Sequence, residues 1–133
     1  MANALFDFGR EGILDRTIDM TGDVRVMLVL SSYAFSNAHK FLADIGAVDN
    51  GRSATLSGHT YAAGVFDAAD TYVNATAASA SKAFILFQHT GSDATARIIH
   101  YMDTPSSGLP FTPAVGQKVN CVFDDGPNRI FKL

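Results

Sequence analysis

The side chains able to bind a metal ion or transfer a proton are few and scattered along the chain. The four histidines are at positions 39, 59, 89 and 100, and no two have the i, i+4 spacing of a helical metal site. His89 and His100 fall in the two halves of a predicted hairpin. They either face each other across the strands or lie at the solvent-facing end of a sheet, and we favour the second arrangement. The sequence predicts no transition-metal site.

The carboxylates match no catalytic or calcium-binding pattern. Asp67 with Asp70, and Asp124 with Asp125, fall in predicted turns, where aspartate usually bonds its own backbone. A glycosidase needs two carboxylates across a cleft, and the sequence leaves that pairing open. The chain has no nucleophile elbow, phosphate-binding loop or dinucleotide fingerprint. We therefore expect a protein that is not an enzyme and has no cofactor.

The charge pattern argues against direct binding of nucleic acid. The chain has 10 Lys and Arg against 13 Asp and Glu, a net charge of −3, without a basic cluster. Only 17% of residues are charged, against about 25% in average soluble proteins, which suggests that a partner covers part of the surface.

No apolar run approaches the ~20 residues of a membrane span, so no membrane insertion is expected. The N-terminus has neither the basic start nor the apolar stretch of a secretory signal, which predicts synthesis in a cytoplasm. The single cysteine, Cys121, lies in a strand pattern and is interpreted as a buried, unreactive thiol.

The elements that must position these side chains are organised around residues 82–103. The apolar run at 83–87 is uninterrupted, as in a central strand covered on both faces, and Phe84 and Leu86 have the same side-chain parity. A second apolar run follows a turn cluster that contains Gly91 and Asp93. The pattern predicts a central hairpin with a longer loop.

The rest of the chain is predicted to cover this hairpin. We expect a strand within 23–35, a helix of about two turns at 37–45 that ends at Gly46, and short strands within 52–76. A proline-rich loop at 104–113 precedes two last strands, 115–123 and 129–133, which are predicted to form a terminal hairpin. The fold class is mainly β: a compact antiparallel β-sandwich or open barrel of about seven short strands with one or two short helices.

One domain is expected over residues 1–133, with an N-terminal segment, 1–14, and a β-rich core, 15–133. The segment is interpreted as a short helix or turn, with Ile13 and Leu14 on its apolar side, that either closes one end of the core or docks on a partner. The interface candidates for docking are Leu5, Phe6, Phe8 and Arg10, because aromatic and Arg side chains dominate interface energetics. We favour closure of the core, with docking as the alternative.

Five segments together resemble a family of small virion proteins of tailed bacteriophages, and they span nearly the whole chain. Their motifs are structural, namely turns, a helix and a terminal strand. The resemblance is carried by residues 1–12, 39–45, 64–70, 90–97 and 125–133.

This resemblance implies a capsid decoration, or cement, protein on the outer surface of the virion head, made in the cytoplasm of a bacterial host. The implied partners are the major capsid protein of the same phage and further copies of this chain, with a homo-oligomer, a trimer above all, expected. The alternatives are a tail or baseplate component and a module that adheres to host-surface glycans.

Overall fold

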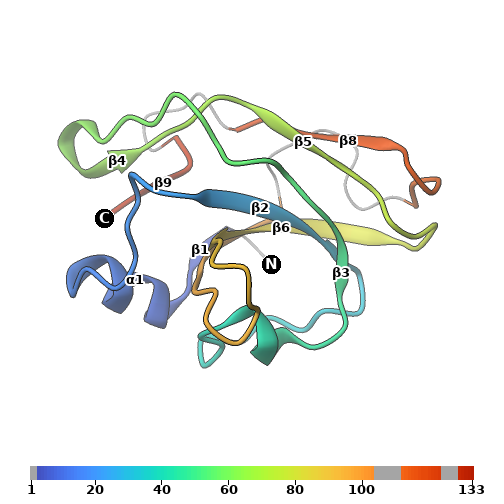
Figure 1. Cartoon of the computed structure of the whole chain (residues 1–133), viewed down its shortest axis with the longest axis horizontal. Coiled ribbons are helices and arrows are strands. Elements are labelled where there is room, and N and C mark those ends of the chain that lie inside the picture. The colour runs from blue at the N-terminus through green and yellow to red at the C-terminus, as the bar shows by residue number, and fades with distance from the viewer. Residues whose placement is uncertain (1–2, 104–111, 124–128) are drawn as a thin grey trace.

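The computed structural model describes residues 3–103, 112–123 and 129–133. The described part is mainly β, with antiparallel strand pairs and one α-helix, as predicted for the fold class. Its largest sheet has five strands in the order β1-β7-β6-β2-β3 (Figure 1). These strands are β1 (Ala4–Leu5), β2 (Val24–Leu30), β3 (Asp49–Arg52), β6 (Ser81–Gln88) and β7 (Ile98–Met102).

Strand β6 lies in the middle of this sheet, and it pairs with β7 as the predicted central hairpin requires. Its side chains alternate between two cores: Phe84 and Leu86 enter one, and Ile85 and Phe87 enter the other. All four are 0% exposed. Both faces of β6 are therefore covered, which explains why its sequence is apolar throughout.

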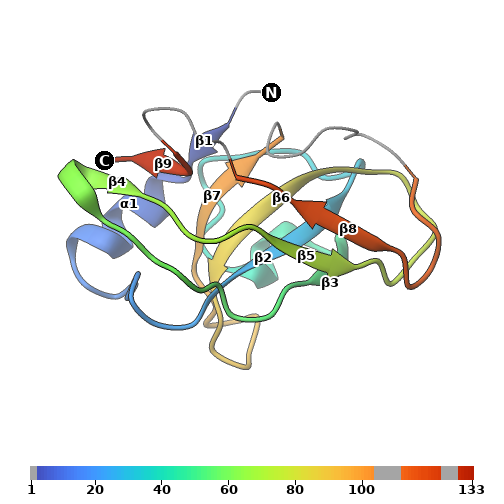
Figure 2. The ribbon, with the colours of Figure 1, turned by 90° about the horizontal axis from the view of Figure 1, so that it is seen from above.

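Two small antiparallel sheets lie over one face of the large sheet (Figures 1 and 2). One pairs β4 (Val65–Phe66) with β9 (Phe131–Lys132), and the other pairs β5 (Thr71–Asn74) with β8 (Lys118–Cys121). The predicted terminal hairpin is wrong, because β8 and β9 each pair with a strand from the middle of the chain. Residues 124–128, the predicted turn, and 104–111, most of the predicted proline-rich loop, lie outside the described residues.

The opposite face of the large sheet is covered by the segment between β2 and β3. The predicted helix at 37–45 is reduced to one 3-10 turn, η1 (Leu42–Ile45), which ends at Gly46 in the left-handed region. Residues 37 and 38 form a turn, and Phe41, directly before η1, is extended and forms a β-bridge with Arg97. The β-bridge between Phe41 and Arg97 thus takes the place of the backbone hydrogen bonds that a longer helix would form.

The N-terminal segment closes one edge of the sheet through β1 and helix α1 (Asp7–Leu14). Gly9 and Gly12 form the buried side of α1, and Leu14, predicted on the apolar side, is exposed. A Cβ at position 9 would lie 2.5 Å from the carbonyl oxygen of Ile99, so Gly9 lets the helix approach β7 closely.

Gly9→Ala is expected to destabilise the protein, although alanine favours a helix interior by about 1 kcal/mol. The added Cβ would contact backbone of β7, and such overpacking typically costs about 1–3 kcal/mol. Urea unfolding measures the difference. Gly22→Ala is the control, because a Cβ there would lie no closer than 3.4 Å to its neighbours, and its loss should be smaller. A Gly9→Ala protein at least as stable as the wild type contradicts the close approach.

Cys121 lies at the end of β8, pairs with Thr71 and is 0% exposed, so the prediction of a buried thiol is confirmed. Burial raises its pKa, and the nearby carboxylate of Asp70 acts in the same direction. We expect a thiol reagent to label the native protein much more slowly than the denatured one. Equal rates would show that the β5–β8 sheet opens readily.

Candidate functional site

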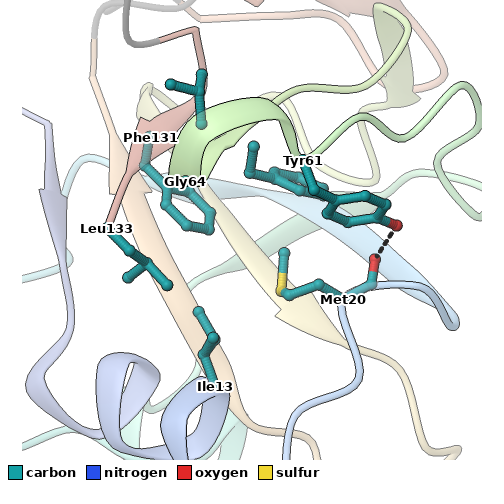
Figure 3. Close-up of a pocket in the computed structure, with 8 residues that line it drawn as sticks. Ile13, Met20, Tyr61, Gly64, Phe131 and Leu133 are labelled. Carbon is teal, nitrogen blue, oxygen red and sulfur yellow. Dashed lines mark hydrogen bonds between the residues drawn. The ribbon is translucent and has the colours of Figure 1, made fainter.

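An apolar hollow of about 180 Å³ opens at the end of the molecule where α1, β4 and β9 come together (Figure 3). Its lining comes from four separate parts of the chain: the end of α1, the loop before β2, the β4 region and the C-terminal strand. The lining residues are Ile13, Met20, Tyr61, Gly64, Val65, Phe66, Phe131 and Leu133.

The β4–β9 pair positions one wall of the hollow. Phe66 lies directly opposite Phe131 in the register, and their rings stack with centroids 5.3 Å apart. The N–H of Leu133 donates to the carbonyl oxygen of Gly64 at 3.0 Å. Gly64 has a φ of 81°, a left-handed conformation that glycine adopts without strain.

A second wall is held by a hydrogen bond between two loops. The hydroxyl of Tyr61 donates to the carbonyl oxygen of Met20 at 3.1 Å (Figure 3). Among the described residues that line the hollow, Tyr61 has the only ionisable side chain, and partial burial together with the nearby Asp19 raises its pKa. The hollow therefore suits an apolar group more than a polar substrate.

Apolar surface continues around the hollow. Tyr61 is 45% exposed and Leu133 is 54% exposed. Leu14, which directly follows Ile13 in α1, is 79% exposed. Tyr61 and Leu133 thus add exposed apolar surface to the hollow, and such surface typically marks a site of protein contact.

A buried arginine anchors α1 beside this surface. Arg97 is 7% exposed, and its guanidinium donates to the carbonyl oxygen of Phe8 at 2.6 Å and to the hydroxyl of Thr17 at 2.9 Å. It also lies 5.7 Å from the ring centroid of Phe41. These neighbours place Arg97 in the role of a structural tie between α1, β7 and the segment before η1.

The structure corrects the interface candidates of the N-terminal segment. Leu5 and Phe6 are 7% and 0% exposed, and they enter the two cores on opposite faces of the sheet. Because both side chains are buried in the cores, they are not available for docking in this conformation. Burial of large apolar side chains in a core is favourable. Phe8 is half-buried, with the ammonium of Lys40 5.2 Å from its ring centroid, and Arg10 is exposed. The segment closes the core, as the favoured interpretation has it.

The histidines also differ from expectation. His100 is 4% exposed, lies opposite Leu86 and packs against the ring of Phe131, so it does not lie at a solvent-facing end of the sheet. His89 lies beyond the last β6–β7 pair and donates its backbone N–H to Asp23. The two histidines do not face each other.

Asp67 and Asp70, the described pair of aspartates, each make a structural contact. Asp67 bridges to Thr60 and lies 3.8 Å from the guanidinium of Arg129, and Asp70 accepts the backbone N–H of Phe123. Within residues 3–103, 112–123 and 129–133, no three His, Cys, Asp or Glu side chains gather as a metal site would require. No helix in that part of the chain is both long and apolar enough to span a membrane.

The hollow itself was not predicted from the sequence. Its lining residues come from positions spread between 13 and 133. None of them stands out in its own local sequence pattern.

Comparisons of the chain with protein-family models, with curated proteins and with solved structures found no match.

Proposed function

We propose that this chain is a structural virion protein of a tailed bacteriophage that binds the outer surface of the capsid and stabilises the head. One observation carries the proposal: large apolar side chains are exposed in two separate regions of the described chain. Tyr61 and Leu133 line the hollow, and Leu14 directly follows the lining residue Ile13. The second region is the β5–β8 sheet, with Tyr72 in β5, Val115 before β8 and Val122 directly after it.

A decoration protein needs two kinds of contact, one with the shell and one with its own copies. Isolated exposed apolar residues are normal, but those that gather around a hollow indicate an interaction surface. The exposed apolar side chains along the β5–β8 sheet offer a second region for the other contact. An enzyme of this size would need only one cleft, lined with polar groups that converge on a substrate.

The segments that carry the resemblance to virion proteins also support the proposal. Residues 64–66 and 129–133 meet at the hollow, next to the end of α1. The other two segments pack on each other: the N–H of Leu42 donates to Ala96 at 2.9 Å, and that of Ala43 donates to Asp93 at 3.0 Å. The resemblance therefore maps onto two places in the fold.

The test is uptake by capsids that lack the protein. Purified protein is mixed with undecorated shells of the phage that encodes it, and bound and free protein are separated by sedimentation. We expect saturable binding in many copies per shell, and no binding of protein that was first heat-denatured. Absence of binding by the native protein contradicts the proposal. Binding to isolated tails, or to a glycan array, would assign the alternative functions.

A further inference from the structure

We propose that Leu14 of one copy occupies the apolar hollow of a neighbouring copy, so that the protein associates with itself through the end formed by α1, β4 and β9. This inference rests on the proposed function, because it supplies the contact between copies that a decoration protein needs. It also has its own test, independent of capsids.

Leu14 has the properties of an anchor side chain. At 79% it is the most exposed of the large apolar residues in the described chain. It stands at the C-terminal end of α1, and the preceding residue, Ile13, lines the hollow. Helix α1 is held firmly by Arg97 and by the close approach of Gly9 to β7, so Leu14 is presented on a rigid element.

The size of the hollow selects the occupant. A cavity of about 150 Å³ accommodates one benzene molecule, whereas sites for drug-sized ligands measure about 300–1,000 Å³. The hollow, at about 180 Å³, is suited to one apolar side chain. Its walls are the stacked rings of Phe66 and Phe131 and the aliphatic side chains of Ile13 and Leu133 (Figure 3).

The charges beside the hollow favour a second copy of the chain over a partner whose surface charges all have the same sign. Arg16 and Asp19 are both exposed, and they line a depression that shares Ile13 and Met20 with the hollow. An acidic partner would leave Asp19 opposite a like charge, and a basic partner would do the same to Arg16. Asp15, directly after Leu14, and Lys132, between Phe131 and Leu133, are exposed as well, so a copy of this surface carries charges of both signs and can match both.

The anchor and the hollow are neighbours on the same surface, so each copy can give Leu14 and receive it at one interface. Contacts that are exchanged in this way close into a dimer with two-fold symmetry. The arrangement requires only the folded chain, and it leaves the apolar group of Tyr72, Val115 and Val122 outside the interface.

The experiment measures self-association of the full chain by light scattering and sedimentation, over concentrations from micromolar to millimolar. Burial of a leucine contributes about 1.5–3 kcal/mol, so Leu14→Ser should weaken association by at least about tenfold. Its melting temperature should stay unchanged, because the side chain is exposed. Val115→Ser removes another exposed apolar side chain, at 70% exposure, and should associate as the wild type does.

A mixing experiment makes the test specific for the hollow. Val65→Trp is designed to fill the hollow and leave Leu14 intact, while Leu14→Ser leaves the hollow intact. We expect each variant alone to associate more weakly than the wild type, and the mixture to form a mixed complex, detected with a tag on one variant, in which one of the two contacts is restored. A wild-type protein that stays monomeric, a Leu14→Ser protein that associates normally, or a mixture that stays monomeric overturns the inference.

The two proposals fail in different ways. Capsid uptake by a protein that is monomeric in solution would overturn the inference and leave the decoration function standing. Self-association through Leu14 without capsid uptake would support the inference and overturn the function.

Discussion

Phe84→Ala is expected to lower the free energy of unfolding by about 3–5 kcal/mol, the usual loss for truncating a buried phenylalanine. Phe84 is 0% exposed, lies on the central strand β6 and belongs to the core between the large sheet and the two small sheets. The loss has two parts: the apolar burial that is lost, and the cavity that the neighbouring side chains of the large and small sheets cannot easily fill. Urea unfolding monitored by circular dichroism measures it.

The control for this variant is Val115→Ala, which truncates an apolar side chain that is 70% exposed. Surface substitutions of this kind usually change stability by less than about 0.5 kcal/mol. If Phe84→Ala were as mild as this control, β6 would not be the strand that joins the two cores, and the sheet order would be in doubt.

Acidification is expected to destabilise the protein between pH 6.5 and about 4 through His100. Burial lowers the pKa of His100 from 6.5 to about 4, and Arg10 acts in the same direction, although backbone groups at Ile130 and Ala4 oppose it. In this window the unfolded chain binds a proton that the folded chain does not, so stability falls as the pH falls. The loss is complete below pH 4 and amounts to about 3 kcal/mol.

His100→Leu should flatten this dependence, because the variant has no proton to bind at that position. Met102→Leu is the matched control: Met102 is buried on the same strand as His100 and has no titratable group, so its replacement should leave the dependence unchanged. Unfolding midpoints of the three proteins from pH 7 to pH 4 give the comparison. A wild-type slope that persists in His100→Leu would assign the acid sensitivity to other groups.

The central hairpin was predictable because its signal is local and strong. An apolar run, a turn with Gly91 and Asp93 and a second apolar run suffice to specify β6 and β7, and the shared parity of Phe84 and Leu86 places both in one core. The strands of the small sheets are different. Strand β9 has two residues, and its pairing with β4 joins segments that are far apart in the sequence, so no local pattern encodes it.

Two errors show where tertiary contacts override local preference. The helical spacing at 37–45 gave way to pairing of Phe41 with Arg97, which leaves only η1. The glycines of α1 weaken a helix in isolation, but Gly9 is the residue that allows α1 to contact β7. The pairing of β1 with β7 and the hydrogen bond from Phe6 to Ile99 place Leu5 and Phe6 in the cores, away from the candidate interface.

The candidate site was not predictable, because its chemistry is apolar and its residues are distant in sequence. Catalytic and metal sites can be recognised from residue types and their spacing. Ile13, Tyr61 and Leu133 have no such pattern, and they line a common hollow only in the folded protein. Leu14 was assigned to the apolar side of α1, and the buried glycines of that helix turn it outward instead.

The most direct test of the account is the position of the protein in the virion that contains it, imaged by electron cryomicroscopy of intact particles. The account predicts density for this fold on the outer surface of the head, repeated over the capsid lattice, with copies in contact through the end that carries Leu14 and the hollow. Density confined to the tail or baseplate, or absent from the particle, would contradict it.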